Sequence, residues 1–196
     1  MKKLLLLLLA LAMLVPTTAF ASDDLTPEQY KTFWSKLDAV ITDNATKSQE
    51  AYAKLLKWKV GKPEVQNLPD GTKINYYPVG DDLGGVFAIG DSKVSAYGLK
   101  NLEKNGIIGL ASFFKFDMPA DFQRALDHPE KVYDTTFVFK GDKLGFGLYV
   151  HPDTKNEKAY LYDVIIFRDL DLFDAIQKAV ESVKRISRVG FFFCAS

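Results

Sequence analysis

The sequence predicts an α+β protein with an N-terminal helical pair, a mainly antiparallel sheet and a C-terminal helix packed on that sheet. Residues 26–59 carry apolar side chains at helical spacing, whereas residues 73–168 are dominated by short apolar runs that end in turn residues. These runs come in groups separated by helical segments, while a doubly wound parallel sheet alternates strands and helices one by one. We therefore expect one α+β domain over residues 22–196.

The first residues have the pattern of a signal peptide. The chain begins Met1-Lys2-Lys3, continues with an apolar run over Leu4–Val15, and then reaches the small-x-small sequence Ala19-Phe20-Ala21. The apolar run is shorter than the ~20 residues that span a bilayer. We therefore expect residues 1–21 to be removed, leaving a soluble periplasmic protein with no stable membrane insertion.

Two amphipathic helices are expected over residues 26–59. The sequence Thr26-Pro27-Glu28-Gln29 contains the residues of a capping box, with proline at the first helical position. The apolar stripe weakens near Asp43. One unbroken helix would be longer than a domain of this size is wide, so we expect a break there, with Asp43 capping the second helix.

Strand signals dominate from Lys73 onward, and the pairs Gly90-Asp91 and Gly141-Asp142 predict hairpin turns. A short helix is expected over Asp117–Leu126 and a longer one over Asp171–Ser187, which is acidic at its start and basic at its end, as the helix dipole favours. The predicted strands are Lys73–Tyr77, Val86–Ile89, Lys93–Leu99, Ile107–Phe116, Thr135–Phe139, Leu144–Val150 and Ala159–Arg168.

The predicted order from Val86 onward is three strands and a helix, twice over. A constant shift of 51 residues aligns Gly90 with Gly141 and Phe116 with Phe167. This register predicts two βββα-like units, residues 86–127 and 135–187, produced by an internal repeat. The alternative is that similar hairpins use the same turn residues without any duplication.

Composition and charge narrow the function classes. The chain carries 25 basic and 25 acidic residues, so its formal net charge is zero and nothing favours nucleic acid as a partner. Cys194 is the only cysteine. It cannot form an internal disulfide, so its thiol stays free or pairs between chains. An exported chain without internal disulfides is consistent with a Gram-negative periplasm.

No residues stand at the spacing of a known catalytic, metal-binding or phosphate-binding motif, so we expect no catalytic residues, no metal and no cofactor. His128 and His151 each precede a proline, which predicts two exposed turns. The alternative is a metal held by both histidines and nearby acids. Asp169, Asp171 and Asp174 are explained by helix capping.

Aromatic residues are concentrated on the expected strands. Along Leu144–Val150, Phe146 shares one face with leucine and valine, while Gly145, Gly147 and Tyr149 share the other. A glycine-lined face accepts either a packed helix or an apolar ligand or peptide. The candidate ligand-binding residues are Phe146, Tyr149, Tyr160 and Tyr162.

The expected function is binding without catalysis, in an accessory or a ligand- or peptide-binding role in the periplasm. The expected partner is a protein, an apolar ligand or a peptide. The binding role needs an exposed apolar edge or groove, which the aromatic strands or the Val189–Cys194 tail could supply. One alternative is an inhibitor or immunity protein that uses the loop His151–Lys158. The other is a small cofactor-free enzyme, which requires converging polar groups with shifted pKa values.

Overall fold

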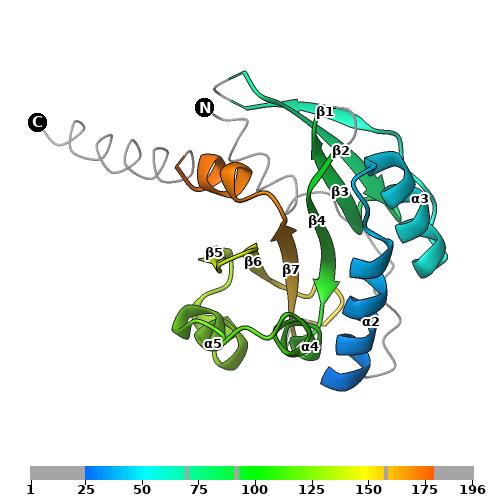
Figure 1. Ribbon diagram of the computed structural model, residues 1–196. Coiled ribbons are helices and arrows are strands. Elements are labelled where there is room, and N and C mark those ends of the chain that lie inside the picture. The colour runs from blue at the N-terminus through cyan, green and yellow to red at the C-terminus, as the bar shows by residue number, and fades with distance from the viewer. Residues whose placement is uncertain (1–24, 69–70, 91–92, 157–158, 179–196) are drawn as a thin grey trace, which may run out of the picture.

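The computed structural model describes residues 25–68, 71–90, 93–156 and 159–178. Within them, seven strands form one antiparallel sheet in the order β1-β2-β3-β4-β7-β6-β5 (Figure 1). The chain therefore builds one half of the sheet as a meander, crosses over through helices, and builds the other half as a second meander. The strands are β1 (Glu64–Asn67), β2 (Lys73–Val79), β3 (Gly84–Ile89), β4 (Lys93–Leu102), β5 (Thr135–Lys140), β6 (Gly145–Pro152) and β7 (Tyr160–Phe167).

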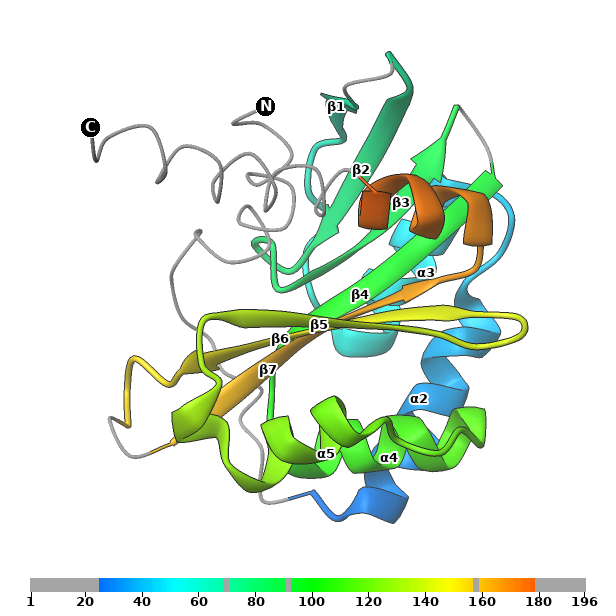
Figure 2. The ribbon, with the colours of Figure 1, turned by 90° about the vertical axis from the view of Figure 1, so that its left-hand side faces the viewer.

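Helices cover both faces of the sheet. One face carries α2 (Pro27–Val40), α3 (Ala45–Leu56), α4 (Lys104–Phe114) and α5 (Ala120–Asp127). A short 3-10 turn, η1 (Pro129–Lys131), follows α5. The helix that begins at residue 170 packs on the other face (Figures 1 and 2). The predicted α+β class, with N-terminal helices, an antiparallel sheet and a C-terminal helix, is confirmed. The predicted signal peptide, the end of the C-terminal helix and the Val189–Cys194 tail lie outside the described residues.

The N-terminal helical pair forms as its capping residues predict. Thr26 and Gln29 make the expected reciprocal capping box, with Gln29 N donating to Thr26 Oγ1 at 3.3 Å and Thr26 N donating to Gln29 Oε1 at 2.8 Å. The break falls after Val40, but the cap of α3 is Asn44 rather than Asp43. Asn44 Oδ1 accepts the Lys47 N–H at 2.9 Å, the contact that a cap makes three residues into a helix.

The prediction of a strand over Ile107–Phe116 is wrong, because these residues form most of α4. Ile107, Leu110 and Ala111 are all buried, at the spacing of one helical face. Gly109 faces α2, where a Cβ atom would lie 2.5 Å from Tyr30 Cβ. The helix is thus packed against both the sheet and α2, and this burial on two sides explains why its sequence lacks the polar stripe of an ordinary surface helix.

The 51-residue repeat is not found in the structure. Phe116 lies in the loop after α4, whereas its predicted counterpart Phe167 ends β7. The same shift matches β3 with β5 and β4 with β6, but it matches β7 with residues 109–116, most of which belong to α4. Common turn chemistry explains the shared Gly-Asp pairs of the sequence without a duplication.

Tyr30 offers a stability test within this core. Its side chain is fully buried, and its hydroxyl has no hydrogen-bond partner within the described part of the chain. A buried unpaired hydroxyl costs about 1–3 kcal/mol, so we expect Tyr30→Phe to leave stability unchanged or raise it by about 1 kcal/mol. The matched control is Tyr52→Phe, which removes a buried hydrogen bond of 2.8 Å to the Gly98 carbonyl and should lower stability. Urea unfolding of both variants checks this, and equal losses would contradict it.

Candidate functional site

Polar side chains gather at one end of the sheet, on the face opposite α2 to α5. They come from the start of β5, from β6 and from β7, strands that are neighbours in the sheet although distant in sequence. We call the set Asp134, Tyr149, His151 and Asp163 the Tyr149 cluster. Its members are connected by hydrogen bonds and ring stacking, so the cluster is the best-defined polar arrangement on this face.

Asp163 is the buried centre of the cluster, with 4% of its surface exposed. Its Oδ1 atom lies 3.1 Å from His151 Nε2 and accepts the backbone N–H of Asn101 at 2.9 Å. Asn101 has a left-handed backbone (φ 58°) and stands where the pairing of β4 with β7 is interrupted. The carboxylate therefore satisfies a backbone donor that the irregular strand pairing leaves without a ladder partner.

His151 faces an acceptor at each ring nitrogen. Nε2 faces the Asp163 carboxylate, and Nδ1 lies 3.1 Å from the carbonyl oxygen of Pro152. A neutral imidazole carries one N–H and satisfies only one acceptor, whereas the protonated ring satisfies both. Burial lowers the pKa of His151, but the Asp163 contact, the Pro152 carbonyl and the Asp134 charge together outweigh burial, so the pKa lies above its usual value.

Tyr149 extends the cluster toward β5. Its ring stacks on His151 with centroids 5.7 Å apart, close enough for attraction between the aromatic face and a protonated imidazole. Its hydroxyl donates to Asp134 Oδ1 at 3.0 Å, at the entry to β5. Burial and the Asp134 carboxylate together raise the pKa of Tyr149 to about 12, so the phenol stays a hydrogen-bond donor at neutral pH.

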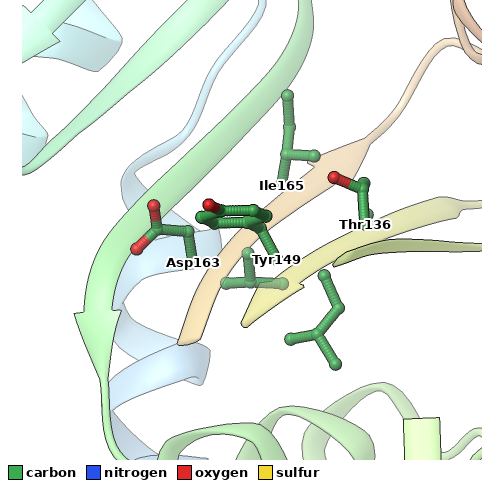
Figure 3. A pocket seen from close by; sticks show the side chains of 7 residues that line it. Thr136, Tyr149, Asp163 and Ile165 are labelled. Atoms are coloured by element: carbon green, nitrogen blue, oxygen red, sulfur yellow. The ribbon is translucent and has the colours of Figure 1, made fainter. Parts of the chain in front are cut away.

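A shallow hollow opens beside Tyr149 (Figure 3). Gly147 lines this hollow. A Cβ atom at Gly147 would lie only 2.7 Å from Ile165 Cγ2, so the close approach of β7 explains the glycine. Thr136 borders the hollow from β5, while Asp163 and Ile165 border it from β7. The hollow is therefore framed by residues of three strands, with Tyr149 among them.

A second ion pair lies at the same end of the sheet, toward β2. Lys100 of β4, 6% exposed, donates from Nζ to Asp82 Oδ2 at 2.8 Å, and the Tyr76 hydroxyl donates to the other Asp82 oxygen. Residues 80–82 all have positive φ angles, between 52° and 70°. A run of left-handed residues is costly outside glycine, and the two donors to Asp82 offset that cost by fixing its position.

The predicted ligand-binding residues do not form one group. Phe146 and Tyr162 are buried in the core under α4 and α5, where the Tyr162 hydroxyl donates to the Ala125 carbonyl at 3.2 Å. Tyr160 is half-buried at the edge of the same core, 6.3 Å from the ring of Tyr133. Tyr149 alone lies on the opposite face, beside the hollow.

The predicted glycine-lined face has two parts. Gly145 lies directly under the Phe173 ring of the C-terminal helix, so helix packing explains this glycine. Gly147, two residues further along β6, lies at the hollow instead. The prediction that His151 occupies an exposed turn is wrong, because His151 lies within β6 and contacts a buried carboxylate. His128 does lie in an exposed turn, after α5.

The edge strand β5, next to β6 in the sheet, is a second candidate for a binding site. Among the described residues it pairs only with β6. Gly141 N donates to Leu144 O at 2.9 Å at the hairpin turn. Hydrogen-bonded pairs alternate along an antiparallel ladder, so Val138 directs its backbone N–H and C=O away from β6. The Val138 side chain is 45% exposed.

Comparison with known proteins gives no relative for this chain. No protein-family model matches it, no curated protein is significantly similar to it, and no solved structure matches it. Within the described ranges, no three histidine, cysteine or acidic side chains are grouped as metal ligands. None of the helices in that part of the chain is both long and apolar enough to span a membrane.

Proposed function

We propose that this protein acts by binding an extended peptide segment of a partner protein along the edge of β5. The observation that carries the proposal is the outward backbone of Val138 on an edge strand with an exposed apolar side chain. Such an edge pairs with an added strand through main-chain hydrogen bonds. With the predicted signal peptide, the proposed place of action is the periplasm.

The sequence of β5 supports this choice of edge. Proteins protect edge strands with prolines, bulges, lysines and other charged side chains, or short length. The strand Thr135–Lys140 contains no proline, its pairing with β6 is regular along its whole length, and its one charged residue stands at its end, paired with Asp174. The opposite edge, β1, has only four residues and starts directly after Pro63. An added strand therefore finds more backbone to pair with at β5.

The geometry of His151 favours binding over acid–base catalysis. A general base needs an unshared nitrogen directed at a substrate. Both ring nitrogens of His151 face acceptors of the protein itself. The Tyr149 hydroxyl likewise donates to Asp134. The polar groups of the cluster are therefore engaged with one another, an arrangement that holds the end of the sheet in shape beside β5.

The test uses a variant that prevents an added strand from pairing with β5 but keeps the hydrogen bonds between β5 and β6. Peptides would be selected from a phage-displayed heptapeptide library on the mature wild-type protein, and their affinities measured by fluorescence anisotropy. Val138→Pro removes an N–H that points away from β6, a position where an edge strand tolerates proline. We expect this variant to bind the selected peptides at least about tenfold more weakly, because a hydrogen bond is lost and the ring obstructs strand addition.

The matched control is Val138→Thr, which keeps the backbone donor and a β-branched side chain. It should bind the peptides within about threefold of the wild type, a difference below 1 kcal/mol. Circular dichroism and thermal melting would verify that both variants fold. Equal binding by the proline and threonine variants, or no selected peptides at all, would overturn the proposal.

A further inference from the structure

We propose that His151 is a pH-dependent connection within the sheet: its protonated ring joins β6 to β7 and to the entry of β5, and loss of the proton loosens this end. The inference rests on the geometry of the Tyr149 cluster and needs no bound peptide. If β5 binds a peptide, the connection also regulates that edge, a consequence that rests on the proposed function.

Two hydrogen-bond acceptors face the His151 ring. His151 Nε2 lies 3.1 Å from Asp163 Oδ1, and Nδ1 lies 3.1 Å from the Pro152 oxygen. Once the ring is neutral, one of these contacts places a nitrogen lone pair against an oxygen lone pair. Both contacts are therefore favourable only for the charged ring, whatever tautomer the neutral ring adopts.

The His151 ring contacts groups that fix the backbone of β4 and the entry of β5. The Asp163 oxygen that faces His151 also accepts the Asn101 N–H, which fixes the left-handed residue in β4. On its other side the ring stacks on Tyr149, whose hydroxyl holds Asp134. Asp134 also has a positive φ angle, 56°, and its N–H donates to Val150 O at 2.8 Å. Two strained backbone positions thus depend on groups that contact His151.

The charged groups that face the His151 ring are mainly carboxylates. Asp163 faces it from β7, Asp134 acts on it from the entry of β5, and Tyr149 stacks on it within β6. On the β4 side, Lys100 precedes Asn101 and is paired with Asp82. The carboxylates of Asp163 and Asp134 both favour the charged form of His151.

The direction of the pH effect follows from these contacts. The pKa of His151 lies above its usual value in the folded protein because Asp163, the Pro152 carbonyl and Asp134 together outweigh burial. A group with a raised folded pKa contributes stability that is complete below its unfolded pKa, about 6.5 for histidine. That contribution is lost as the pH rises through the folded pKa. The contacts of the charged ring are thus complete below about pH 6.5 and loosen as the pH rises through the folded pKa of His151.

The test measures the connection directly in the full chain. Nuclear magnetic resonance of ¹⁵N-labelled histidine should show both His151 nitrogens protonated below the midpoint, with a midpoint above about 6.5. Across the same titration, the hydrogen-exchange protection factors of the Asn101 and Asp134 amides should fall about tenfold, the loss expected for a charged hydrogen bond. The Gly61 amide, which donates to Pro78 O near β2, serves as the reference and should keep its protection factor.

Two variants separate the connection from a general pH effect. His151→Gln keeps an amide donor for Asp163 but cannot titrate, so its Asn101 protection factor should not change over this pH range. Asp163→Asn should lower the His151 midpoint. The proposal is overturned if His151→Gln keeps the pH dependence of the wild type, or if His151 titrates at or below 6.5. Neither readout involves a peptide, so failure here is distinct from failure of the β5 proposal.

Discussion

Replacing Gly109 with alanine should destabilise the protein by about 3 kcal/mol, the upper part of the range for overpacking a core. An added Cβ atom would lie 2.5 Å from Tyr30 Cβ, 2.7 Å from the Pro27 carbonyl oxygen and 2.8 Å from Lys31 N. Two of these atoms belong to the backbone of α2, so no side-chain rotation relieves the contact. The helix pair α2–α4 must separate, and the core beneath it loosens. Urea unfolding of the variant measures the loss.

Gly106→Ala is the matched control, since Gly106 lies in the same helix and also faces α2. An added Cβ atom there would approach no atom closer than 3.1 Å, and the three nearest atoms belong to the side chains of Leu102 and Tyr30. Alanine also has a higher helix propensity than glycine by about 1 kcal/mol. We expect Gly106→Ala to change stability by less than about 1 kcal/mol. Similar losses in both variants would show that close packing at Gly109 is not the cause.

Local patterns predicted the parts of the fold that depend on local interactions. The Thr26–Gln29 capping box and the Gly141-Asp142 turn were found because each needs only residues within one turn of chain. The segment Ile107–Phe116 was misassigned because a continuous apolar run fits a buried strand and a buried helix equally well. Gly106 and Gly109, three residues apart, were the available sign of close helix packing. The sequence does not show that α2 packs against these two glycines, so they do not by themselves distinguish a helix from a strand.

The candidate site was less predictable because it depends on strand register. His151 and Asp163 are twelve residues apart along the chain, yet they meet across β6 and β7. The exposed-turn expectation for His151 came from the following proline, which in fact ends the strand. One signal was present: Asp163 is the only charged residue in the apolar run Ala159–Phe167. A charge within a buried strand requires a partner, although the sequence does not say which one.

Asp163→Ala should lower the free energy of unfolding by about 3 kcal/mol, because breaking a buried ion pair leaves the partner charge buried without compensation. The Asp163 side chain is buried, with 4% of its surface exposed. Its removal deprives both His151 Nε2 and the Asn101 N–H of their acceptor. The loss should be largest below pH 6.5, where the His151 ring is charged in both states, and smaller in alkaline solution.

The matched control is Asp174→Ala, which breaks the exposed ion pair with Lys140. The two side chains of that pair are 43% and 39% exposed, and Lys140 Nζ lies 2.7 Å from Asp174 Oδ2. Solvent screens such a pair, so its removal should cost less than about 1 kcal/mol. Urea unfolding at pH 6 and pH 9 compares the two variants. A loss for Asp163→Ala no larger than that for Asp174→Ala would mean that the buried carboxylate does not hold this end of the sheet. A large loss that is independent of pH would instead assign its stabilising effect to the Asn101 hydrogen bond alone.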